Sequence, residues 1–358
     1  MTTDNKDRLA YLNLVSQGFQ RAEQAVSGSH SCYIEIGQYK ICLKFAGNVL
    51  IPFVKPSIAH LMTEETQNPD LTIHLWDSIS TDTSLPLLLS SLVTLLGSKW
   101  WKYEDKRGEI DNYSGDFLKT AFYPYPNRLS VLDLAQNVAY YWVEDAQETP
   151  YYEMGASLRV ILHWWLSQRQ LQYVHAGAVG TKEGGVLMAG KGGSGKSTTA
   201  LTCLNSGLSY ASDDYSLVQL NPQPHVYSLY NTAKLKGKED LVRFPQLASK
   251  IRNSDRLDTE KALLFVHEHF PEKVINEFPL KAILIPYVTG KPDTHLIPIS
   301  AGKALIALSI STIFQLPGAN QNALNFMSKL VQKVPCYQLA LGTKMEQIPE
   351  TILKLLSA

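Results

Sequence analysis

The chain has 358 residues, enough for two domains of ordinary size or for one large decorated domain. Hydrophobic residues make up 45% of it and charged residues 18%, a globular balance that excludes bulk disorder. Lys and Arg together number 33, as do Asp and Glu, and this neutrality argues against a large nucleic-acid-binding surface.

The sequence also carries no sign of export or of a membrane span. Residues 1–14 lack a basic stretch followed by an apolar one, and no run reaches the ~18 uninterrupted apolar residues that a membrane span needs. The cysteines have no metal-ligand spacing and are expected to be reduced: Cys32, Cys42, Cys203 and Cys336. We therefore expect a soluble, cytoplasmic protein that binds neither membrane nor nucleic acid.

The first part of the chain is predicted to be rich in strands. Apolar and polar residues alternate over residues 39–45 and 71–75, which is the pattern of half-buried strands. Two more strand-like runs, 129–134 and 138–143, are separated by three residues, a spacing suited to a hairpin. With some helix near each end, residues 1–147 are predicted to form a strand-rich α+β domain.

The pattern changes after residue 147. Apolar residues at 158, 161, 162, 165 and 166 form the stripe of an amphipathic helix. Strand-like runs follow at 171–179, 185–189, 210–220, 280–286, 295–299 and 336–340. Helix-like runs stand at 196–205, 321–333 and 346–356. We predict an α/β domain over residues 148–358.

A phosphate-binding loop stands between one of these strands and a helix. The motif G-x-x-x-x-G-K-[ST] is matched at every fixed position by Gly190, Lys191, Gly192, Gly193, Ser194, Gly195, Lys196 and Ser197. Glycines let the backbone aim its N–H groups at phosphate oxygens, and the helix that continues with Thr198 adds its positive end. Lys196 is predicted to contact the β and γ phosphates of ATP, and the Ser197 hydroxyl to ligate Mg²⁺. The alternative is a glycine-rich turn without a ligand.

An adjacent pair of carboxylates, Asp213 and Asp214, follows the helix that the loop opens. Phosphoryl transfer uses one carboxylate to hold Mg²⁺ and another to accept the proton of the attacking hydroxyl. Neighbouring residues of a regular strand face opposite sides, so both can reach one site only where the strand ends or bulges. The alternative is a solvated acidic turn.

Two further residues are candidates for the same site. His175, in an apolar strand-like run, could orient an aspartate by a hydrogen bond, or it could be an ordinary core histidine. Lys234 lies in a charged stretch after the aspartate pair. It could contact the γ phosphate or the acceptor, as transfer needs a cation there, or it could belong to a solvated face.

Three linked motifs give the sequence a family resemblance. An H-x-x-x-V segment begins at His175, the phosphate loop begins at Gly190, and a G-x-x-x-x-S-D-D segment runs from Gly207 to Asp214. In order and spacing these resemble the HPr kinase/phosphorylase superfamily, whose catalytic domain is related to phosphoenolpyruvate carboxykinase. The resemblance covers about residues 158–220 well, the tail weakly, and the first part of the chain not at all.

By that resemblance Asp213 is the catalytic base, Asp214 the magnesium ligand beside Ser197, and His175 their partner, although the two aspartate roles could be exchanged. The family's glutamate and arginine after the Asp pair are missing, and residues 231–238 stand in their place. This departure counts against HPr itself and against phosphorolysis. The sequence is more similar to HPr-kinase-like proteins of bacterial peptide-biosynthesis clusters, including lasso-peptide kinases, which modify a peptide serine.

Together these observations predict an HPr kinase/phosphoenolpyruvate carboxykinase-like P-loop kinase domain of α/β class, preceded by the strand-rich domain as a unit that could recognise the acceptor. The expected activity is ATP- and Mg²⁺-dependent transfer to an alcohol group, with serine in a peptide or protein as the first acceptor. Two alternatives are a kinase of a small hydroxyl compound, such as a free amino acid or a sugar, and a nucleotide-binding regulator without catalysis. Whether the protein forms a homo-oligomer stays open.

Overall fold

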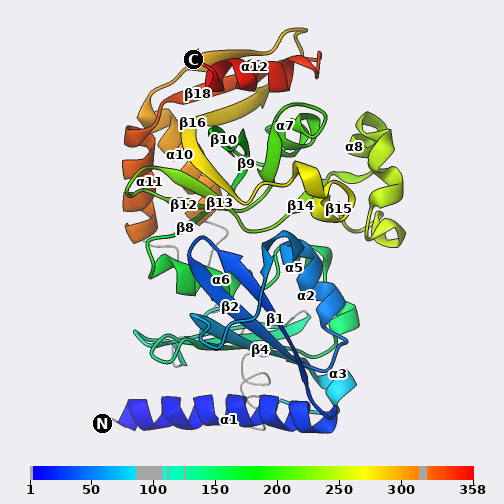
Figure 1. Ribbon diagram of the computed structural model, residues 1–358, viewed down its shortest axis with the longest axis vertical. Coiled ribbons are helices and arrows are strands. Elements are labelled where there is room, and N and C mark those ends of the chain that lie inside the picture. Colours follow the sequence, from blue (N-terminus) through cyan, green and yellow to red (C-terminus); the bar gives the residue numbers. More distant parts are fainter. Residues whose placement is uncertain (1–2, 86–107, 111–112, 125, 314–320) are drawn as a thin grey trace. The chain divides into compact units, whose positions relative to one another are not determined.

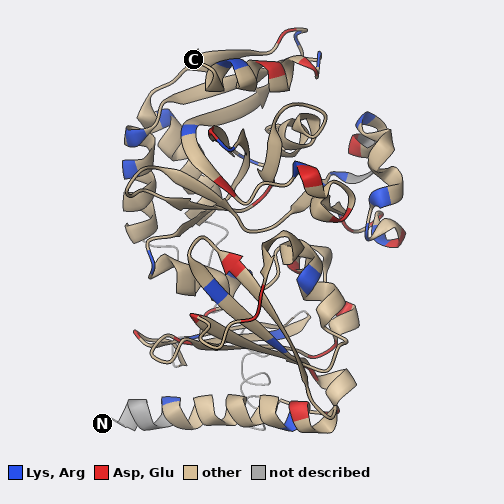
Figure 2. Ribbon diagram, viewed as in Figure 1, with Lys and Arg blue, Asp and Glu red and all other residues tan. Residues whose placement is uncertain are grey.

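The computed structural model describes residues 3–85, 108–110, 113–124, 126–313 and 321–358. The chain divides into two compact units, one of residues 1–56 and 62–165 and one of residues 57–61 and 166–358 (Figure 1). The sequence predicts a domain boundary at 147/148. The division of the chain into units falls after Trp165, within helix α6 (Arg159–Ser167). Figure 2 shows basic and acidic residues interspersed over both units.

The first unit is built on a seven-stranded mixed sheet with the order β3-β1-β2-β4-β7-β6-β5. Its strands are β1 (Ser29–Ile36), β2 (Tyr39–Ala46), β3 (Met62–Thr63), β4 (Leu71–Asp77), β5 (Leu118–Pro124), β6 (Asn127–Asp133) and β7 (Val138–Val143). Its longer helices are α1 (Thr3–Ala25), α2 (Ile51–Ile58) and α6. The alternating strands and the hairpin predicted from the sequence are confirmed, and Val15 and Phe19 of α1 pack with Trp76 and Val131 of the sheet in one core.

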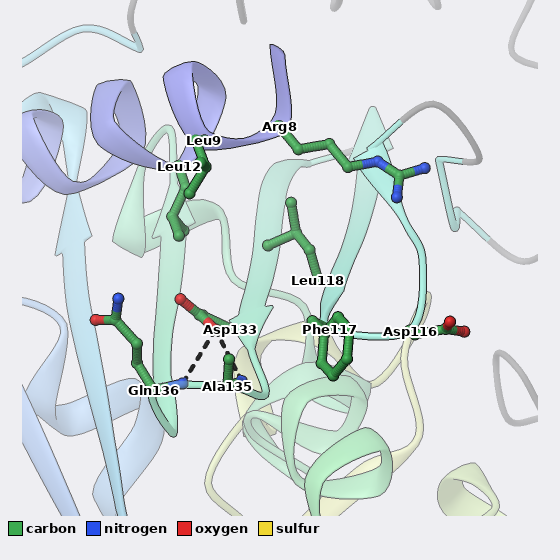
Figure 3. Close-up of a pocket in the computed structure, with 9 residues that line it drawn as sticks. All are labelled: Arg8, Leu9, Leu12, Asp116, Phe117, Leu118, Asp133, Ala135 and Gln136. Carbon is green, nitrogen blue, oxygen red and sulfur yellow. Dashed lines mark hydrogen bonds between the residues drawn. The ribbon is translucent and has the colours of Figure 1, made fainter. Parts of the chain in front are cut away.

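A hollow of about 470 Å³ lies in the first unit between α1 and the β6–β7 turn (Figure 3). Leu9 and Leu12 of α1 face it from one side and Phe117 from the other. The turn is fixed by Asp133, whose Oδ1 accepts the backbone N–H groups of the residues two and three positions later, at 2.9 and 3.1 Å. This carboxylate therefore shapes one side of the hollow.

The second unit is α/β, with a nine-stranded sheet and a two-stranded one. The large sheet contains β8 (Gln172–Val174), β9 (Ala176–Thr181), β10 (Gly184–Ala189), β11 (Ser209–Ser212), β12 (Ser216–Gln219), β13 (His225–Ser228), β16 (Glu277–Val288), β17 (His295–Pro298) and β18 (Cys336–Leu341). Strands β10, β16 and β18 run parallel, and the remaining pairs are antiparallel. The small sheet pairs β14 (Thr232–Leu235) with β15 (Ala262–Phe265).

Helices cover both faces of β10. They are α7 (Lys196–Cys203), α10 (Ala301–Ile313), α11 (Gln321–Lys333) and α12 (Gln347–Leu356). Val186 and Met188 share a core with α7 and α12, whereas Leu187 and Ala189 share another with α10 and α11. Side chains of a strand alternate between faces, so a strand covered on both sides reads as a continuous apolar run. In the described part of the chain, no helix is long and apolar enough to cross a membrane.

Two strand predictions are wrong in the same way, because each predicted strand is interrupted in the middle. The run 171–179 forms β8 and β9 with His175 between them, and the run 210–220 forms β11 and β12 with residues 213–215 between them. The two breaks face each other. Ala178 pairs with Ser212 on one side of them and Val174 with Ser216 on the other.

Hydrogen bonds hold the facing breaks in place. The hydroxyls of Ser212 and Ser216 are fully buried, and both donate to the carbonyl oxygen of Ala176, at 3.4 and 2.9 Å. Gly177 lies so close to the opposite strand that a Cβ atom there would be 3.0 Å from the carbonyl oxygen of Asp213. The histidine and the aspartate pair thus leave the sheet at the same level.

The close approach of β9 and β10 gives a test of this packing. A Cβ atom on Gly185 would lie 2.5 Å from Cε2 of Phe278 and 2.6 Å from the carbonyl oxygen of Val179. We expect Gly185→Ala to lower the free energy of unfolding by about 1–3 kcal/mol, measured by urea unfolding, because overpacking strains a close-packed core. Gly302→Ala, where the Cβ atom would have no neighbour within 4 Å, is the control and should be neutral or slightly stabilising. Equal effects at both positions would contradict the packing.

Candidate active site

The loop between β10 and α7 has the backbone conformation that its glycines permit. Gly190, Gly193 and Gly195 have φ angles of 146°, 78° and 104°, which residues with a Cβ atom rarely adopt. At Gly195 a Cβ atom would also lie only 2.3 Å from Cδ1 of Leu341. The loop leads directly into α7, and the first N–H groups of a helix have no partner within it. This is the geometry in which helix N-termini bind phosphate.

Lys196, the first residue of α7, folds back over this loop. Its ammonium donates to the carbonyl oxygen of Gly190 at 2.7 Å and to that of Lys191 at 3.4 Å, and the residue is 8% exposed. Burial lowers the pKa of Lys196, and the charges of Asp213 and Asp214 offset part of that change. The ammonium therefore lies inside the loop and within electrostatic reach of both carboxylates.

Asp213 is buried, with one carboxylate oxygen in use. Its Oδ2 accepts the backbone N–H of Lys234 at 3.0 Å, while its Oδ1 has no hydrogen-bond partner in the described structure. Burial raises the pKa of Asp213 and the charge of Asp214 raises it further, against the opposing influence of the Lys234 N–H and the nearby Ser197 hydroxyl. Asp213 therefore holds a proton more readily than an ordinary aspartate.

The pKa of Asp214 is shifted in the opposite direction, downward. Its Oδ1 lies 2.7 Å from Nε2 of His175, and its Oδ2 accepts a hydrogen bond of 2.7 Å from the ammonium of Lys234. Burial alone would raise the pKa of Asp214, but the ion pair with Lys234 and the contact with His175 outweigh it and hold the pKa well below the usual range. Asp214 is therefore an anion at neutral pH, because its neighbours stabilise the charge.

The structure thus brings the predicted site residues of four elements together. They are His175 from the first break, Lys196 and Ser197 from α7, Asp213 and Asp214 from the second break, and Lys234 from β14. Gly192 and Lys191 are exposed on the loop, and Thr198 is partly buried in the first turn of α7. Sequence reasoning missed Tyr215, whose ring centre lies 5.5 Å from that of His175 and 5.9 Å from the Lys234 ammonium.

Oxygen donors in this arrangement fit a magnesium ion that arrives with a nucleotide. Among the described residues no group of three or more His, Cys, Asp or Glu side chains could hold a metal ion alone. Mg²⁺ in nucleotide sites usually needs only one or two protein ligands, because phosphates and water supply the others. Ionised Asp214 and the Ser197 hydroxyl would be such ligands, and Oδ1 of Asp213, which has no hydrogen-bond partner among the described residues, is a further oxygen beside them.

A hollow of about 650 Å³ adjoins the loop. Residues 190–194 and His175 line one part of it. Val288 of β16, together with Ile306 and Ile310 of α10, lines another. The hollow therefore connects the phosphate loop, the histidine that contacts Asp214 and an apolar surface within one unit.

Comparison with solved structures gives a weak structural likeness. No family model and no curated protein matches the chain. A solved structure, the Hpr(Ser) kinase/phosphatase from Coxiella burnetii, matches over 51% of this chain and 94% of its own, with 13% sequence identity and a TM-score of 0.30.

The opposite states of the two aspartates predict opposite effects on stability. Asp214, with its depressed pKa, stabilises the fold above the ordinary value of 3.8, and this stabilisation is lost as pH falls through the depressed folded value. Asp213, with its raised pKa, makes the fold less stable as pH rises from 3.8 through the raised value. Asp214→Asn should therefore cost about 1–3 kcal/mol at neutral pH, whereas Asp213→Asn should be neutral or stabilising.

Urea unfolding of both variants and the natural protein, from about pH 3 to about pH 8, measures this difference. Each variant is the control for the other, because both replace one carboxylate by an amide at adjacent positions. Identical pH dependence of the free energy of unfolding in the two variants would contradict the assignment of opposite pKa shifts.

Proposed function

We propose that the protein is an ATP- and Mg²⁺-dependent phosphotransferase that moves the γ-phosphoryl group to a hydroxyl, with a serine of a peptide or protein as the acceptor. One observation carries this proposal: two adjacent carboxylates with different partners lie within electrostatic reach of Lys196 of the glycine-rich loop, Asp214 held by Lys234 and His175, and Asp213 with an Oδ1 that has no hydrogen-bond partner among the described residues. The directions of their pKa shifts agree with this difference, and titratable neighbours whose environments separate their pKa values divide acid–base work between them.

The loop supplies the nucleotide site. Lys196 now donates to the carbonyl oxygens of Gly190 and Lys191, and its lowered pKa reflects the cost of burying an ammonium with weak acceptors. Phosphate oxygens would be better acceptors because they carry charge. The loop and the N-terminus of α7 would then hold the β and γ phosphates, with Lys196 as the cation that neutralises them.

Asp214 and Ser197 would hold the magnesium ion, which would neutralise charge on the phosphates. The negative charge of Asp214 suits a divalent cation. Its Oδ2 already accepts a hydrogen bond from the Lys234 ammonium, so the magnesium ion would share the carboxylate with Lys234. His175 keeps the other oxygen of Asp214 oriented. Since Lys234 shares this carboxylate, its ammonium would also stabilise charge on the transferred group.

Asp213 would be the general base. The acceptor oxygen attacks the γ phosphorus, the bond from that phosphorus to the bridging oxygen of ADP breaks, and the hydroxyl proton passes to Oδ1 of Asp213. Within the described residues that oxygen has no hydrogen-bond partner, while Oδ2 accepts the Lys234 N–H at 3.0 Å. The raised pKa of Asp213 brings it closer to working pH, which makes it a stronger base than an ordinary aspartate.

Removal of the Lys196 ammonium tests the nucleotide site. We expect Lys196→Ala to weaken ATP binding by about 30-fold or more, roughly 2 kcal/mol, because the phosphates lose a buried charged partner. Isothermal titration with ATP and Mg²⁺ measures this, with the exposed Lys182→Ala on the far end of β9–β10 as the control. Unchanged ATP affinity in Lys196→Ala would contradict the proposal that this loop binds the nucleotide.

Asp213→Asn separates transfer from binding. The substitution keeps the shape and the acceptor for the Lys234 N–H but removes the base, so transfer should fall by about 10²–10⁴-fold while ATP affinity changes little. The assay is labelled ATP with serine peptides, free serine and sugars, followed by mass analysis. If Asp214→Asn shows this pattern instead, the two roles are exchanged. If the natural protein binds ATP but phosphorylates no acceptor, it is a nucleotide-dependent regulator.

A further inference from the structure

Large apolar side chains are exposed together at one place in the second unit. Ile306, Ile310 and Val288 are 60%, 55% and 67% exposed, and all three line the 650 Å³ hollow beside the phosphate loop. Single exposed apolar residues are normal on protein surfaces, whereas several that gather in a concave place mark a binding site. We call these three residues the apolar wall.

Helix α10 ties this wall to the catalytic residues. Ile306 and Ile310 are four positions apart and therefore share one face of the helix. The last turn of α10 holds the backbone of His175: the Thr312 hydroxyl oxygen accepts its N–H at 3.0 Å, and the Ser311 hydroxyl donates to its carbonyl oxygen at 3.4 Å. Since His175 contacts Asp214, the wall has a fixed position relative to the aspartate pair.

The hollow also reaches the aspartate pair through His175. Its loop lining is residues 190–194, and His175, which also lines it, contacts Oδ1 of Asp214. A group bound there would therefore touch both the glycine-rich loop and the partner of Asp214. A free sugar or free serine offers no apolar group that would cover the wall, whereas a peptide can do so with the side chain beside its serine.

We propose that the apolar wall binds an aliphatic or aromatic side chain that neighbours the acceptor serine in a peptide. This inference rests on the proposed kinase function and specifies its substrate class. Burial of such a side chain against two isoleucines and a valine removes apolar surface of both partners from water. The wall would thereby select the peptide, while the aspartate pair performs the transfer.

Serine peptide libraries, each with Leu, Phe, Lys or Asp fixed at one position beside the serine, test this with labelled ATP. For the natural protein we expect kcat/KM to be about 10-fold or more higher with a fixed Leu or Phe, which corresponds to ~1.4 kcal/mol. In Ile306→Asn and Ile310→Asn the ratio of kcat/KM values between apolar and charged flanking residues should fall towards one. ATP affinity and thermal unfolding should be unchanged in both variants. Ile297→Asn, at an exposed isoleucine of β17 outside the hollow, is the matched control and should keep the preference.

The outcomes distinguish the two proposals. Transfer to peptides without any flanking preference would overturn the wall as an acceptor site and leave the kinase function standing. Loss of ATP affinity in Ile306→Asn or Ile310→Asn would instead place the nucleoside in the hollow and also overturn the inference. Binding of ATP without transfer to any acceptor would overturn the kinase function, and the inference with it.

Discussion

The ion pair between Asp214 and Lys234 is the interaction on which the rest of the site depends. Two adjacent carboxylates in a mostly buried place repel each other, and burial penalises the charge of each. Lys234 compensates in two ways, because its ammonium pairs with Asp214 and its backbone N–H binds Asp213. Without Lys234 both carboxylates would tend to take up protons, and the difference between them would shrink.

Lys234 can do this because it stands in a strand that packs in the core. Lys234 pairs with Leu263 of β15, which is fully buried, and the flanking residues Ala233 and Leu235 belong to the same core as α7. A lysine on a mobile loop would lose more side-chain entropy on forming the same pair. The ammonium is therefore held in place by packing in the strand as well as by charge.

The glycine-rich loop was the part of the candidate site that the sequence could specify most fully. Each glycine of this loop with positive φ stands where the motif has one or allows one, and local backbone geometry depends on residue type within a few positions. The proximity of Asp213 and Asp214 to the loop could be proposed from their order along the chain. That both leave the sheet at a break agrees with the condition that adjacent residues can share one site only where a strand is interrupted.

Other features could not be read from the pattern. The breaks in β8–β9 and β11–β12 were missed because residues on both sides of each break are buried, so each run was predicted as one continuous strand. Helix α10 was missed because Ile306 and Ile310 are exposed and add apolar residues to what would be its polar face, which removes the stripe that identifies a surface helix. The feature that hid the helix is the one from which the apolar wall is inferred.

Asp213 is the residue of the candidate site that lowers the stability of the fold when it is ionised. Burial destabilises its ionised form and the charge of Asp214 adds to this, so the pKa is raised. Among the described residues its Oδ1 has no hydrogen-bond partner, whereas the two oxygens of Asp214 contact Nε2 of His175 and the ammonium of Lys234. Two adjacent residues of the same sequence thus differ in charge state because their surroundings differ. Under the proposed function, Oδ1 of Asp213 is the oxygen that would receive the proton of the acceptor hydroxyl.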